Sequence, residues 1–98
     1  MQFLVVMKLK PGITREKLAP IARVETQKAW DLVAAGVMRT IHYIAGGGAV
    51  MLLETPDRAQ AESHINALPI VEAGLVDTEL LELAPYTGFA ALFAAPAS

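Results

Sequence analysis

Glu25 is the first residue whose type and position suggest chemistry. It lies in a segment, residues 15–35, whose apolar residues recur at helical spacing. At about 100° per residue, Glu25 falls inside the apolar stripe, between Ile21 and Ala29. A carboxylate facing a protein core needs a hydrogen bond, a paired cation or a proton, and burial raises its pKa toward the range of a useful base. Glu25 is therefore a candidate catalytic acid or base; the alternative is a structural ion pair with Arg39.

A second group of candidates lies in the predicted strand at residues 37–45. Strand alternation predicts that Arg39 and Tyr43 share one face and that His42 lies on the other. Arg39 is a candidate for binding a carboxylate ligand, with Tyr43 beside it as a second substrate-binding residue. His42 is a candidate acid or base, although a lone histidine in a strand is more often structural. Trp30 lies off the apolar stripe, where it would cap a substrate pocket or contact another subunit.

The elements that must position these residues follow from periodicity and turn signals. The strands are expected at residues 2–9, 37–45, 49–55 and 75–84, and the helices at 15–35 and 56–68. Three glycines, Gly46 to Gly48, separate the second and third strands and lead into a strand rather than a helix, which predicts a hairpin turn and not a phosphate-binding loop.

The order β-α-β-β-α-β predicts an α+β, ferredoxin-like domain over residues 1–86. Such a domain is a four-stranded antiparallel sheet with two helices on one face. The strands are apolar on their other face as well, so we expect a second sheet to cover it in a homo-oligomer. Residues 87–98 form an apolar C-terminal tail that we expect to pack on a partner subunit.

Composition excludes several classes of protein. The 98 residues are 54% hydrophobic and 18% charged, more apolar material than the thin core of one small domain can hide. The sequence has no run of about 18 apolar residues, so a membrane-spanning helix is not expected, and the first residues do not resemble a signal peptide. The net charge is −2 with scattered cations, which argues against nucleic-acid binding. The chain has no cysteine, so thiolate chemistry is excluded, and a cytoplasmic location is expected.

The chain resembles a known family. The stretch LVAAGVMRTIHYIAG, a following strand, the TPD helix entry, INALPI and VDTELLELAPY are similar to muconolactone Δ-isomerase and its relatives, which are dimeric α/β barrels. The resemblance covers about residues 2–86. It implies a sheet-to-sheet dimer and an enzyme that moves a proton within a small unsaturated lactone carboxylate, without metal or cofactor.

The resemblance also implies roles for individual residues. Glu25 falls on the position of the family's acid/base candidate, which takes a proton from a carbon beside a carbonyl and returns it two carbons away. Arg39 matches an arginine suited to the substrate carboxylate. His42 and Tyr43 stand where the isomerase has tryptophan and arginine. The function we expect is a cofactor-free isomerase that acts on a small lactone or organic acid, with Glu25 as the base. Two other functions remain open: a non-catalytic binding or assembly module, and a haem-binding relative that would use His42 or His64.

Overall fold

The structure is a computed structural model, and it describes residues 1–95. Its elements, in chain order, are β1 (Gln2–Leu9), α1 (Arg15–Ala34), β2 (Met38–Tyr43), β3 (Ala49–Glu54), α2 (Arg58–Asn66), α3 (Pro69–Glu72), β4 (Val76–Leu83) and α4 (Ala90–Phe93). In residues 1–95, no helix is both long enough and apolar enough to cross a membrane.

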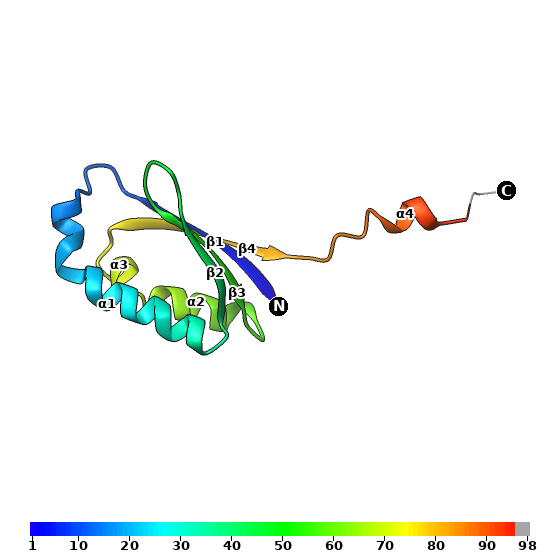
Figure 1. Cartoon of the computed structure of the whole chain (residues 1–98), viewed down its shortest axis with the longest axis horizontal. Helices are drawn as coiled ribbons and strands as arrows, with labels where there is room; N and C mark the ends of the chain where they lie inside the picture. Colours follow the sequence, from blue (N-terminus) through cyan, green and yellow to red (C-terminus); the bar gives the residue numbers. More distant parts are fainter. Residues whose placement is uncertain (96–98) are drawn as a thin grey trace.

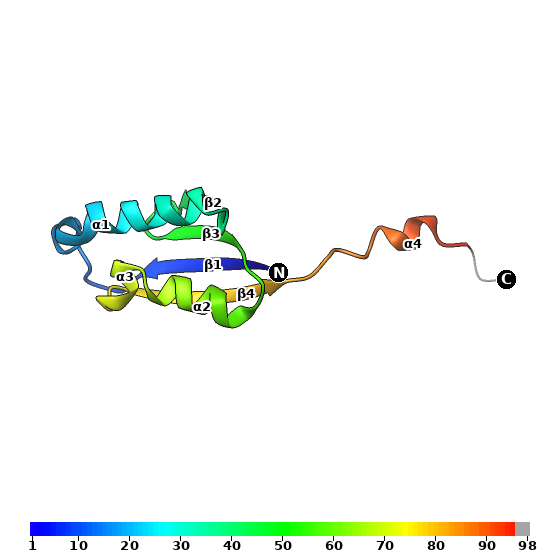
Figure 2. The same ribbon diagram turned by 90° about the horizontal axis from the view of Figure 1, so that it is seen from below.

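The four strands form one antiparallel sheet in the order β2-β3-β1-β4. Helices α1, α2 and α3 cover one face of this sheet (Figure 1). Turned by 90°, the molecule shows α1 beside the β2–β3 half and α2 beside the β1–β4 half (Figure 2). This arrangement is the βαββαβ plan, so the predicted α+β, ferredoxin-like fold class is confirmed.

The two long helices pack against the sheet differently. Helix α2 buries Ala61 and Ile65 completely or nearly so, whereas α1 has no buried residue along its 20 residues. Thr14 caps α1 by accepting a hydrogen bond from the Lys17 backbone N–H at 3.4 Å. The inward side of α1 is only partly buried because it borders a cavity instead of a packed core.

The second predicted helix is two helices. Leu68 has an extended backbone (φ −68°, ψ 133°) and Pro69 is the first residue of α3. A residue before proline is pushed out of the helical region, and proline is well suited to the first helical turn. The chain therefore stops at Leu68 and restarts at once. This restart leaves backbone N–H groups at the beginning of α3 that need acceptors.

Strand β2 contains a β-bulge, so its side chains do not alternate between the two faces as predicted. Met38 pairs with Leu53 but Thr40 already pairs with Leu52, so Arg39 is an extra residue. Beyond the bulge, Tyr43 pairs with Ala49 and lies on the helix-covered face, as Met38 does. The prediction that Arg39 and Tyr43 share one face is therefore wrong.

The glycine-rich stretch is a hairpin turn between β2 and β3, as predicted. The Ile44 N–H donates to the Gly48 carbonyl and the Gly47 N–H donates to the Ile44 carbonyl, both at 2.9 Å. All three glycines have positive φ. A Cβ on Gly48 would collide with the Met7 carbonyl oxygen, so this position also requires glycine for close packing.

Within residues 1–95, no element covers the other face of the sheet (Figure 2). It presents apolar side chains from β1, β3 and β4: Leu4, Val6, Val50, Leu52, Leu81 and Leu83. The chain then leaves the domain after β4 and projects away from it (Figures 1 and 2). Four large side chains of this projecting segment are mostly exposed: Tyr86, Phe89, Leu92 and Phe93. Residues 96–98 of the predicted tail lie outside the described residues.

Candidate functional site

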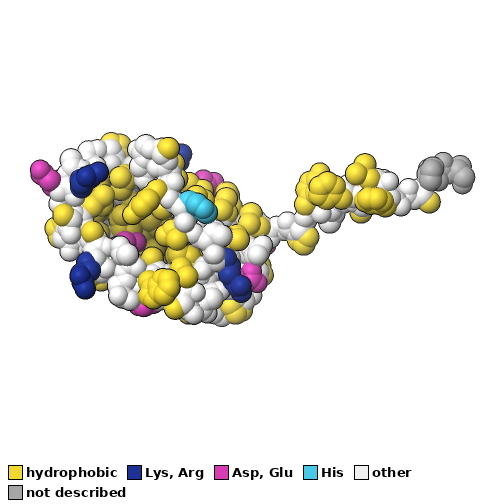
Figure 3. All heavy atoms as spheres, in the orientation of Figure 1, with side chains coloured by type: hydrophobic (Ala, Val, Ile, Leu, Met, Phe, Trp, Pro, Cys, Tyr) yellow, Lys and Arg dark blue, Asp and Glu magenta, His cyan; other side chains and the backbone are white. Residues whose placement is uncertain are grey.

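A cavity of about 580 Å³ lies between α1 and the sheet. Its size falls within the range of about 300–1,000 Å³ that is typical of small-molecule sites. Most of its lining is apolar, including the side chains of Met7, Met38 and Met51 from three adjacent strands and Val33 from α1. Figure 3 shows this hollow in the hydrophobic surface. The three methionines border the cavity without filling it, so an apolar ligand has room to bind.

Glu25 projects from α1 into this apolar cavity. Its Oε2 accepts a hydrogen bond of 3.0 Å from the backbone N–H of Ile70 in α3. That N–H is one of the unpaired donors created by the restart of the chain at Pro69, so the carboxylate serves the role of a helix cap. Among residues 1–95, Oε1 accepts no hydrogen bond and neither oxygen forms an ion pair. One oxygen is therefore held in place while the other is free toward the cavity.

The electrostatic environment of Glu25 is that of a carboxyl in a partly dry site. Burial raises its pKa above the ordinary value of 4.5, and the hydrogen bond from the Ile70 N–H offsets part of that rise. A half-buried carboxylate with a raised pKa is a stronger base than an exposed one. The alternative of an ion pair between Glu25 and Arg39 is not observed.

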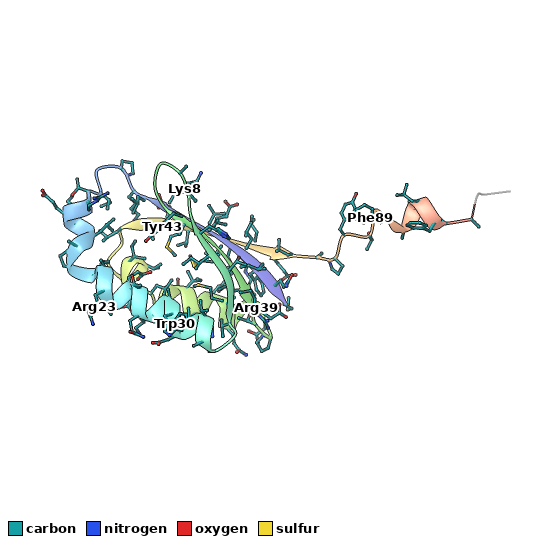
Figure 4. The ribbon with its side chains drawn as sticks, viewed as in Figure 1. Lys8, Arg23, Trp30, Arg39, Tyr43 and Phe89 are labelled. Carbon is teal, nitrogen blue, oxygen red and sulfur yellow. The ribbon has the colours of Figure 1, made fainter. Side chains whose placement is uncertain are left out.

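The structure does not bring Arg39 and His42 to Glu25. Arg39 is the exposed bulge residue and does not line the cavity. Figure 4 shows Arg39 and Tyr43 toward opposite ends of β2. His42 pairs with Val50. It lies on the uncovered face of the sheet, because its neighbour Tyr43 faces the helices and successive strand residues alternate between faces. His64, on α2, also lies outside the cavity lining.

The structure does place Tyr43 and Trp30 at the cavity. Both belong to its lining, and both are largely exposed, at 95% and 62%. They are therefore rim residues on opposite sides, one on β2 and one on α1 (Figure 4). The Tyr43 hydroxyl makes no hydrogen bond to another described residue, so it is free to contact a ligand. The other rim hydroxyl, Thr26, donates to the Ala22 carbonyl at 2.9 Å.

Sequence reasoning missed the partner of Glu25. Ile70 contributes a backbone N–H and lies 45 residues away, so no side-chain type or spacing points to it. The Leu68-Pro69 pair is the one signal that could have indicated a helix start with unpaired donors in this part of the chain. The methionines of the cavity wall likewise read as ordinary core residues.

No protein-family model matches the chain, and no curated protein matches it significantly. Solved structures do match in three dimensions, and two of them are informative. The first is 5-chloro-2-hydroxyhydroquinone dehydrochlorinase from Burkholderia phenoliruptrix AC1100, in complex with 2,5-dihydroxybenzoquinone. It has a TM-score of 0.76 and 17% sequence identity, and the match covers 90% of this chain and 98% of that one.

The second structure is muconolactone isomerase. It has a TM-score of 0.73 and 23% identity, and the match covers 89% of this chain and 92% of that one. At these identities the comparisons establish a shared fold and leave the reaction open. The predicted resemblance is thus confirmed at the level of architecture: the chain has the α+β fold of muconolactone isomerase over nearly its whole length.

Proposed function

We propose that this chain is a cofactor-free enzyme that shifts a proton within a small unsaturated lactone or a related carbonyl compound. The observation that supports this function best is Glu25: among the described residues it is the one carboxylate lining the apolar cavity, with one oxygen held by the Ile70 N–H and the other free. Similarity in fold to muconolactone isomerase agrees with it.

The chemistry needs one group that both accepts and returns a proton. Glu25 removes a proton from one carbon of the conjugated system, and the electron pair of the broken C–H bond moves toward the carbonyl oxygen. The protonated Glu25 then gives the proton to the carbon two positions away, and the carboxylate is regenerated. The raised pKa of Glu25 brings its basicity closer to that of such a carbon acid. An apolar cavity excludes water that would otherwise exchange with the intermediate.

The test is the isomerisation of muconolactone, followed by ultraviolet absorbance. Glu25→Gln should lower turnover by about 10² or more, because an amide cannot accept the proton. Glu16→Gln is the matched control, because Glu16 is an exposed glutamate in the first turn of the same helix. Equal turnover by the wild type and Glu25→Gln would contradict the proposed function.

A non-catalytic binding protein is the second candidate. It is favoured by the hydrogen bond to Ile70, since Glu25 would then be retained to cap α3 and not to move protons. This reading predicts that ligands bind to the cavity and are recovered unchanged. Following the bound ligand by NMR for a shifted double bond separates the two candidates.

The assembly we propose is a homo-oligomer in which a second copy covers the open face of the sheet. Leu81 and Leu83 are 40% and 41% exposed there, beside four further apolar side chains of β1 and β3. Exposed apolar surface costs about 25 cal/mol for each Å², so burial against an identical face is favourable. We place the apolar tail, residues 87–98, on the partner subunit for the same reason; Phe93 alone is 85% exposed.

A further inference from the structure

The cavity has no positive charge. None of the residues that line it within the described chain is lysine, arginine or histidine. Its ionisable side chains are Glu25 and Tyr43. Two arginines of the elements that border the cavity lie outside its lining: Arg39 is the exposed bulge residue, and Arg23 points away from the hollow on the outer side of α1 (Figure 4).

An anionic ligand would meet two penalties in this cavity. Its charge would lose water and gain no cation or cluster of donors in return, because the walls are mostly apolar. It would also lie in the same small volume as the Glu25 carboxylate, and two like charges in one site oppose each other. Proton abstraction requires Glu25 to be ionised, so the second penalty is largest in the reactive state.

We infer that the cavity selects an uncharged cyclic carbonyl compound, such as a neutral lactone, cyclic enone or quinone-like ring, and discriminates against carboxylates. The carbonyl oxygen accepts a hydrogen bond from the Tyr43 hydroxyl, which is otherwise unpaired among the described residues. The acidic C–H faces the free oxygen of Glu25, and the methionine-lined wall contacts the ring. The catalytic part of this inference rests on the proposed function, whereas the preference for an uncharged ligand rests on the cavity alone.

Tyr43 gives this arrangement a specific role. When Glu25 removes the proton, negative charge develops on the carbonyl oxygen of the ligand. A neutral hydroxyl donor stabilises that charge without attracting a ligand that is already anionic. The arginine that would attract a carboxylate is absent from the rim, since Tyr43 faces the cavity and Arg39 does not.

The experiment compares muconolactone with its methyl ester, two ligands with the same ring that differ in charge. Trp30 is the only tryptophan in the chain and lies on the cavity rim, so its fluorescence reports binding. Binding is measured on the full-length Glu25→Gln protein, which prevents turnover and reports the apolar penalty alone, and is checked by calorimetry. Turnover is measured with the wild type, in which the Glu25 charge adds the second penalty. We expect the ester to bind about 10-fold or more tightly than the acid and to react with a kcat/KM at least about 10-fold higher.

Two further variants locate the effect. Tyr43→Phe should weaken binding of the ester by about 5- to 10-fold, the usual loss for one neutral hydrogen bond. Arg39→Ala should leave the affinity for the acid as it is. Tighter binding of the acid, loss of that binding in Arg39→Ala, or no binding of either ligand would overturn the inference.

The outcomes also separate this inference from the proposed function. If the ester binds more tightly but the wild type isomerises neither ligand, the ligand preference stands and the proposed isomerase fails. If the wild type prefers the acid and Glu25→Gln abolishes its turnover, the isomerase stands and the preference for uncharged ligands fails.

Discussion

The Glu25 carboxylate and the Ile70 backbone N–H join the two helices that border the cavity, at a distance of 3.0 Å. The contact connects the middle of α1 to the first turn of α3, so the side chain that holds these helices together is also the one to which the proposed function assigns the chemistry. The two contributions can be measured separately, because they depend on different properties of the carboxylate.

Removing the acceptor for the Ile70 N–H should destabilise the fold. We expect Glu25→Ala to lower the free energy of unfolding by about 1–3 kcal/mol, because a part-buried donor is left unpaired. Glu25→Gln keeps an acceptor oxygen and should cost less than half as much. Urea unfolding of the three proteins tests this, and equal losses for both variants would show that the hydrogen bond is not the source of the stability.

The stability should depend on pH through Glu25. Because its folded-state pKa is raised above 4.5, the native state binds a proton more tightly than the unfolded chain. This tighter proton binding by Glu25 stabilises the folded state. The stabilisation is full below pH 4.5 and is lost as the pH rises through the folded-state pKa of Glu25. The difference in unfolding free energy between wild type and Glu25→Gln, measured across this window, should follow that trend. A difference independent of pH would contradict it.

The same ionisation should govern the reaction. Only ionised Glu25 can accept a proton, so kcat/KM for an uncharged ligand should rise with pH, with its midpoint above 4.5. An uncharged ligand is needed because its own ionisation then adds nothing to the profile. A midpoint at or below the ordinary carboxyl value would indicate that a different group is the base.

Gly48 should tolerate substitution much less well than Gly46. Both have positive φ, +98° and +93°, so alanine costs backbone strain of about 1–2 kcal/mol at either site. At Gly48 the added methyl would also collide with the Met7 carbonyl oxygen, whereas nothing lies within 4 Å at Gly46. Thermal unfolding of Gly48→Ala should therefore show the larger drop in Tm, with Gly46→Ala as the control.

The open sheet face should control assembly. Leu52 lies at the centre of that face, between Leu4 and Thr40 in the pairing of the strands. Leu52→Glu should shift the protein to smaller species, because a carboxylate buried between two sheets is unpaired. Ala22→Glu, at an exposed position on α1, is the control. Sedimentation analysis measures the mass of the assembly in solution, and an unchanged mass for Leu52→Glu would contradict face-to-face assembly.

Much of the fold could be predicted because its signals are local. The strand alternation in residues 2–9, the Thr14 cap and the three glycines each specify an element without reference to the rest of the chain. The position of Glu25 on the inner side of α1 followed from helical geometry alone. These features needed only periodicity and turn chemistry.

The features of the site that the sequence did not predict depend on contacts between elements that are distant in the chain. A bulge depends on how two strands pair, and the sequence of β2 alone contains nothing that marks Arg39 as the extra residue. Arg39 and Tyr43 therefore do not share a face in the structure, and Arg39 is not placed to bind a ligand carboxylate beside Tyr43. The break between α2 and α3 had a local signal, Leu68-Pro69, but its consequence for Glu25 required the packing of α3 on α1.

The bulge at Arg39 also determines where β2 can change its length. Since Met38 and Thr40 are already neighbours in the pairing with β3, deleting Arg39 would leave a regular strand in which Ile41 and Tyr43 still face the cavity. Deleting Thr40 instead would give the same regular pairing with Arg39 in its place, whereas a deletion within β3, which has no extra residue, would shift its pairing with β1 and β2. Strand β2 can therefore lose one residue near the bulge without altering the wall of this cavity, and β3 cannot.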